Sequence, residues 1–75
     1  MKKCRDSLMM LKYLILSDSE PQYLVVAVKM PNGQIELITN TRGIGEKVEY
    51  YLNTYDENMR LKHNQDVEVV EVWYV

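Results

Sequence analysis

The fold is decided by residues 23–39, which read YLVVAVKMPNGQIELIT. The first half is rich in β-branched residues, and the second half alternates Ile35 and Leu37 with polar neighbours, as strands do. Between the halves, Pro31 fixes φ for the first turn position, Asn32 tolerates the second, and Gly33 accepts the left-handed conformation that closes a type I turn with a bulge. The stretch predicts a β-hairpin with strands at 23–30 and 34–39.

Two other apolar segments lie on either side of this hairpin. Residues 8–16 are apolar almost throughout and end at the polar run 17–21, a pattern that predicts a buried strand. Residues 66–75 alternate until Val69-Val70, where the alternation slips. The slip predicts a β-bulge, or burial of the strand on both faces.

An amphipathic helix is predicted between the hairpin and the last strand. Apolar residues recur there at helical spacing, namely Ile44, Val48, Tyr51, Leu52, Tyr55 and Met59. The opposite side carries Glu46, Tyr50, Asn53 and Glu57. Asp56 and Arg60 stand four residues apart, the basic run 60–63 suits a helix C-terminus, and Asn64 is expected to end the helix. Gly43 is expected to let the backbone turn from strand to helix.

These elements predict an α+β two-layer sandwich in the order β-β-β-α-β. Its mostly antiparallel four-stranded sheet carries one helix on one face, and the strand order across the sheet is 34–39, 23–30, 8–16, 66–75. The last strand should run parallel to the first or the third. Residues 9–75 form the single domain, and residues 1–8 are expected to be a flexible N-terminal extension that folding does not require.

Length and charge limit the classes of function. A chain of 75 residues has room for one core. Residues 1–12 carry four basic groups against one acidic group, whereas residues 13–75 carry five against ten. The acidic part repels a phosphate backbone, so nucleic-acid binding would need Lys2, Lys3 and Arg5, with Tyr13 or Tyr23 as stacking platforms. No apolar run reaches the ~18 residues of a spanning helix, so no membrane partner is expected and the cytoplasm is the expected compartment.

Side chains that could carry catalysis are few. Cys4 and His63 are the only cysteine and histidine, and neither lies in a recognisable catalytic motif. The neighbouring carboxylates Glu46 with Glu49, Asp56 with Glu57, and Glu68 with Glu71 are typical of a solvated acidic surface. We therefore expect no catalytic residue, no metal ligand and no cofactor, and a protein that is not an enzyme.

The C-terminal strand offers more apolar surface than one helix covers. Valines, a tryptophan and a tyrosine occupy both of its faces, and Tyr50 is the aromatic residue expected on the exposed side of the helix. The candidate partner-binding residues are Trp73, Tyr74, Val72, Glu71, Tyr50, Glu46 and Glu57.

The sequence favours a small non-catalytic protein-binding module that acts as a stoichiometric inhibitor or adaptor on another protein. The alternatives are a homodimeric structural or adaptor protein, in which the same surface binds a second copy, and a nucleic-acid binder that uses the basic N-terminal arm.

The layout of residues 10–75 resembles that of small bacteriophage-encoded accessory proteins that bind and inhibit host or defence proteins. The features that carry the resemblance are the short acidic chain, the hairpin Tyr23 to Thr39, the tyrosine-rich helix around Val48-Glu49-Tyr50-Tyr51-Leu52, and the plain terminal strand. The resemblance implies an inhibitor or adaptor without a cofactor.

Overall fold

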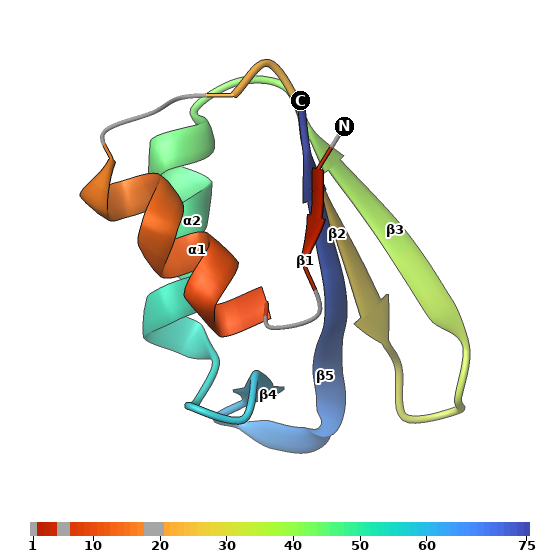
Figure 1. Cartoon of the computed structure of the whole chain (residues 1–75). Helices are drawn as coiled ribbons and strands as arrows, with labels where there is room; N and C mark the ends of the chain where they lie inside the picture. Colours follow the sequence, from red (N-terminus) through yellow and green to blue (C-terminus); the bar gives the residue numbers. More distant parts are fainter. Residues whose placement is uncertain (1, 5–6, 18–20) are drawn as a thin grey trace.

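The computed structural model shows an α+β fold with two helices on the same side of an open antiparallel sheet (Figure 1). It describes residues 2–4, 7–17 and 21–75, the first three by their backbone alone. The elements are β1 (Lys2–Cys4), α1 (Ser7–Leu16), β2 (Leu24–Lys29), β3 (Ile35–Asn40), α2 (Ile44–Thr54), β4 (Arg60–Leu61) and β5 (Asn64–Tyr74). Across the sheet the strands follow the order β1-β5-β2-β3, and β4 pairs with the first part of β5.

The predicted hairpin is confirmed as β2 and β3. The Gly33 N–H donates to the Met30 carbonyl at 2.8 Å, the Met30 N–H donates to the Gln34 carbonyl at 2.8 Å, and Gly33 has a φ of 88°. The Asn32 side-chain oxygen accepts the Gln34 N–H at 3.0 Å. These bonds fix the register in which Val28 lies opposite Glu36.

The predicted strand over residues 8–16 is wrong, because this segment is the helix α1. Its buried residues are Ser7, Met10, Leu11 and Leu14, at spacings of three, one and three residues. That spacing places one side of a helix against α2 and β5. A nearly continuous apolar run has no alternation, so periodicity alone does not separate a buried strand from a helix. The expectation of a single helix is wrong for the same reason.

The C-terminal strand β5 lies in the middle of the sheet, which corrects the predicted strand order. β2 pairs with one edge of β5, and β1 and β4 pair with the other edge. β5 runs antiparallel to all three and in the same direction as β3, from which β2 separates it. The predicted bulge is confirmed, since Val69 lies opposite Val28 and Glu71 opposite Ala27, which leaves Val70 as the extra residue.

The predicted helix after the hairpin is confirmed as α2, but it ends at Thr54. Gly43 has a φ of 60° just before its first residue, as expected for the turn from strand to helix. Of the predicted apolar side, Leu52 is half-buried and the other five residues are buried. Residues 60–63 do not extend the helix. They form β4 and the turn into β5, because the Asp56 carboxylate accepts the N–H groups of Asn58 and Arg60 and reverses the chain.

Asn40 joins the two layers at the end of β3. Its side chain is 8% exposed and donates to the Leu24 carbonyl of β2 at 3.2 Å. It also hydrogen-bonds the side chain of Tyr51 on α2. Because both partners are protein groups, this buried amide is not left unsatisfied.

The predicted N-terminal extension contains structure among its described residues. Lys2–Cys4 form β1, whose register places Lys3 opposite Trp73 and Cys4 opposite Val72. Residues 1, 5 and 6 lie outside the described residues. The predicted boundary after residue 8 falls inside α1.

Candidate protein-interaction surface

The sheet has one covered face and one open face. Leu24, Val26 and Val28 of β2 and Val72 of β5 are almost fully buried beneath the helices. Their neighbours along each strand point to the other side, which no described helix covers (Figure 1). We call this side the open face. Its residues are Val25, Ala27 and Lys29 from β2, Ile35, Leu37 and Thr39 from β3, and Glu68, Val70, Glu71 and Trp73 from β5.

The open face is mostly apolar on β2 and β3, and β5 adds Glu68 opposite Lys29 at one end and Glu71 opposite Ala27 in the middle. Leu37 is 65% exposed and Ile35 is 51% exposed, whereas Trp73 and Val25, directly opposite each other, are half-buried. Ala27 is only 2% exposed between Leu37 and Glu71. A half-buried tryptophan on a face with aliphatic neighbours is typical of the centre of a protein–protein contact.

Two of the predicted partner-binding residues, Trp73 and Glu71, lie on this open face. Val72 and Tyr74 lie on the opposite side of β5. Val72 is 0% exposed, and Tyr74 packs against the buried core. The four predicted residues of this strand therefore lie on opposite faces of the sheet, and only the face with Trp73 and Glu71 is open to solvent.

The predicted residues on the helix side lie far from Trp73 in the architecture. Tyr50 is 52% exposed on α2, where its ring meets Tyr51 edge-on with 5.3 Å between ring centroids. Glu46 is exposed in the first turn of α2, and Glu57 is exposed in the turn beyond its end. Since α2 lies over the covered face of the sheet, the structure does not bring these three residues together with Trp73 and Glu71 (Figure 1).

A second apolar surface, which the sequence analysis missed, lies on α1. Met9, Tyr13 and Leu16 are 64%, 53% and 85% exposed and follow one another at helical spacing. The sequence contained a signal for this surface, namely the nearly continuous apolar run. A surface helix that is apolar almost all round must expose apolar side chains to water. Residues 18–20, which follow α1, lie outside the described residues.

The candidate catalytic pair is not brought together. Cys4 pairs with Val72 near one end of β5, and His63 lies in the turn just before Asn64 at the other end. At about 3.3 Å per residue, these positions are about 25 Å apart along the strand. They are too distant for a nucleophile and its base, which need hydrogen-bond contact.

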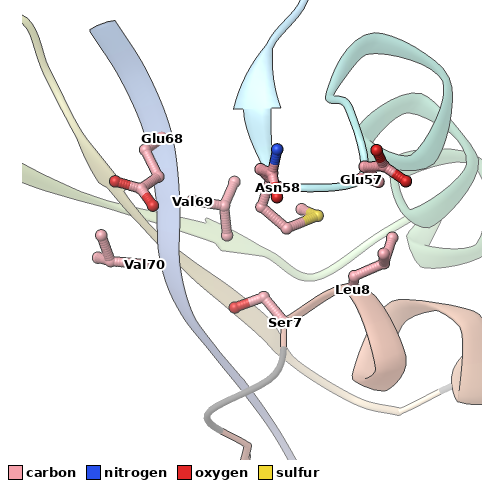
Figure 2. A pocket seen from close by; sticks show the side chains of 8 residues that line it. Ser7, Leu8, Glu57, Asn58, Glu68, Val69 and Val70 are labelled. Carbon is pink, nitrogen blue, oxygen red and sulfur yellow. The ribbon is translucent and has the colours of Figure 1, made fainter. Parts of the chain in front are cut away.

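An open cleft of about 460 Å³ lies where the start of α1 meets the loop before β4 and the middle of β5. Figure 2 shows Val69 on the side of β5 that faces Ser7 and Asn58, with Glu68 and Val70 on the other side of the strand. The cleft also contains Met59, which is 5% exposed and has a φ of 59°. Within residues 2–4, 7–17 and 21–75, no three His, Cys, Asp or Glu side chains are grouped so that they could hold a metal ion.

Among the described residues, three side chains have shifted pKa values. Backbone hydrogen bonding, from the Arg60 N–H first, lowers the pKa of Asp56. Burial raises the pKa values of Tyr51 and Tyr55, which keeps both phenols neutral at physiological pH. These tyrosines belong to the core and are not poised for acid–base chemistry near neutral pH.

Among the residues of the nucleic-acid alternative, Lys2 and Tyr23 lie at the same end of the sheet, because Tyr74 lies opposite both Lys2 and Leu24, whereas Tyr13 lies on α1. Lys2 and Lys3 belong to β1, Arg5 lies outside the described residues, and Tyr13 and Tyr23 are 53% and 45% exposed.

In the described part of the chain, no helix has the length and apolar character needed to cross a membrane. Comparison of the chain with protein-family models, curated proteins and solved structures found no match.

Proposed function

We propose that the protein is a non-catalytic binding module that docks onto another protein through the open face, as a stoichiometric inhibitor or adaptor. The observation that carries the proposal is the placement of Trp73. It lies in the central strand, half-buried, on the side of the sheet away from both helices. Tryptophan is enriched among the residues that dominate binding energy at protein interfaces.

The surroundings of Trp73 indicate the chemistry of the partner. Val25 lies opposite Trp73 on β2, and Val70 and Leu37 add aliphatic surface on the same face. Of the open-face residues of β2, β3 and β5, Glu68 and Glu71 are acidic and Lys29 is basic, and the register places Lys3 of β1 opposite Trp73. An apolar protein surface with polar groups at its rim would complement this arrangement.

The geometry changes the surface proposed from the sequence. The protein-binding role is kept, but Val72 and Tyr74 become core residues and the acidic side of α2 becomes a separate surface. Trp73 and Glu71 are joined instead by residues of β2 and β3. A phage-type accessory role and a cytoplasmic setting agree with this proposal and stay predictions.

The test is co-purification of partners with the tagged chain from cells of its source organism. Trp73→Ala should lower the yield of a specific partner about 10-fold or more, the effect expected of a central interface aromatic. Tyr50→Ala removes a more exposed aromatic from the other side of the molecule and should leave the yield within about twofold.

A second variant on the open face protects the test against a folding defect. Val70 is the extra residue of the bulge, so Val70→Lys places a charge on the open face without breaking a residue pair. Circular dichroism should show native structure for all three variants. The proposal is contradicted if both Trp73→Ala and Val70→Lys capture the partner as well as the wild type does. Loss of capture in Tyr50→Ala alone would show that the binding site lies on α2.

A further inference from the structure

We propose that the free edge of β3 binds the β3 edge of a second copy of the chain, antiparallel and centred on Leu37. The two sheets would then join into one continuous sheet with a two-fold axis. This self-pairing goes beyond the proposed partner-binding function, which a monomer could also perform.

β3 ends the sheet and presents unpaired backbone groups. In the described part of the chain, β2 is its only neighbour in the sheet. Because Met30 donates to the Gln34 carbonyl, alternate residues of β3 from Glu36 onward bond to β2. The N–H and C=O groups of Ile35, Leu37 and Thr39 therefore point away from β2, in the direction from which another strand would approach.

The edge lacks the features that usually prevent strand pairing. Over Ile35–Asn40 there is no proline and no lysine, and Glu36 is the only charged residue. The β2–β3 register runs through without a bulge. Ile35, Leu37 and Ile38 are 51%, 65% and 39% exposed. An exposed, regular and apolar edge of this kind is a template for pairing with another strand.

The side-chain pattern of β3 fits a copy of itself. With Leu37 opposite Leu37 of the second copy, Ile35 lies opposite Thr39 on the open face, and Glu36 lies opposite Ile38 on the other face. This register pairs all three outward-pointing residues, and no like charges face each other. A register centred on Glu36 would place two carboxylates directly opposite, and one centred on Ile38 would pair only two of the outward-pointing residues within β3.

The join would also extend the apolar surface. Leu37 lies opposite Ala27 on β2, so pairing would create an unbroken row of Ala27, Leu37 and the same two residues of the second copy. Trp73 lies two strands away from β3 and would stay open in the dimer. Self-pairing and docking of a foreign protein are therefore compatible on one molecule.

Cysteine cross-linking tests the register. In a Cys4→Ser background, Leu37→Cys should give a disulfide-linked dimer under mild oxidation, because directly opposite residues in a hydrogen-bonded pair are about 5.5 Å apart between Cα atoms. Ile35→Cys is the matched control on the same face of the same strand. Its counterpart in the second copy would lie about 13 Å further along the strand, so it should not cross-link alone, but should cross-link with Thr39→Cys.

Oligomeric state tests the association without any cysteine. Sedimentation across a concentration series should show the wild-type chain approaching twice its monomer mass. Leu37→Pro removes an N–H that points away from β2 and should weaken association 10-fold or more, while Leu37→Thr keeps that N–H and should weaken it less.

Three outcomes would overturn the inference. They are a wild-type chain that stays monomeric to millimolar concentration, equal cross-linking at positions 35 and 37, or cross-linking of Ile38→Cys without Leu37→Cys. None of these outcomes is measured by partner capture, which is tested by Trp73→Ala and Val70→Lys outside β3. Failure of the dimer and failure of the docking face are thus separate results.

Discussion

Gly43 and Gly45 are two residues apart, yet they have opposite conformational requirements. Gly43 has a φ of 60° immediately before α2, whereas Gly45 lies within the first turn of that helix. An added Cβ at Gly43 would meet only Glu46 Oε2 at 3.8 Å, so the difficulty there is the left-handed backbone and not a steric clash. An added Cβ at Gly45 would meet nothing within 4 Å.

The two alanine variants should therefore change stability in opposite directions. Gly43→Ala should lower the free energy of unfolding by about 1 kcal/mol, because alanine is strained at positive φ. Gly45→Ala should raise it by about 0.5–1 kcal/mol, because alanine loses less backbone entropy in a helix. Urea denaturation measures both values. Two shifts of the same sign would show that Gly43 does not keep its left-handed conformation in solution.

At the level of elements, the turn that ends α2 depends on one carboxylate. Asp56 Oδ1 accepts the Asn58 N–H at 2.9 Å and the Arg60 N–H at 3.0 Å. The Arg60 carbonyl in turn accepts the Asp56 N–H at 2.8 Å. These bonds turn the chain from the helix into the β4–β5 hairpin.

The lowered pKa of Asp56 gives this turn a pH dependence. The folded state favours the ionised carboxylate, so its stabilising contribution is complete above the ordinary pKa of 3.8 and is lost as the pH falls through the lower folded value. Asp56→Asn should melt below the wild type at pH 7, and the gap should narrow as the pH falls from 4 to 2. Thermal melting followed by circular dichroism measures the gap.

A neighbouring carboxylate supplies the control for this effect. Glu57→Gln removes the same charge from an exposed position one residue along, and should leave the melting temperature at pH 7 near that of the wild type. A gap between wild type and Asp56→Asn that stays constant from pH 7 to pH 2 would mean that the charge of Asp56 does not stabilise the turn.

Predictions that depend on residues close together in the sequence were correct, and predictions that depend on packing between distant segments were not. The hairpin turn at 31–33 and the buried side of α2 depend on neighbouring residues, and both were correct. The bulge at Val69-Val70 was also visible, because an extra residue breaks the alternation of a strand. The run 8–16 was misassigned, because its helical state comes from packing against α2 and β5, which the local pattern does not contain.

The candidate site was predicted in part for a related reason. Trp73 and Glu71 were identified because they belong to an apolar terminal strand. Leu37, Ile35 and Val25 were missed because their shared face depends on which strands lie side by side. Once 8–16 was taken as a strand, the C-terminal strand was assigned to an edge of the sheet. The edge position of residues 34–39 was predicted, and β3 lies there.

For the molecule as a whole, the exposed surfaces follow from how few elements the chain has. Two helices cover the side of the sheet where β2 and β5 bury their valines, and Ile38 of β3 is still 39% exposed on that side. The other side and the β3 edge have no further element among the described residues to cover them. In a domain this small, apolar surface left open by the fold is the surface available to partners.

The contribution of β1 to this fold can be measured directly. Deletion of Lys2–Cys4 removes the strand that pairs with Val72–Tyr74, so the free energy of unfolding should fall by about 1–3 kcal/mol, the net value of a few backbone hydrogen bonds. Replacing the same three residues by threonines keeps the backbone ladder and should recover most of the loss. Urea denaturation measures the free energy of unfolding of the two variants. A deletion as stable as the wild type would show that folding does not require the N-terminal residues, and that β5 is stable in the sheet with β2 and β4 alone.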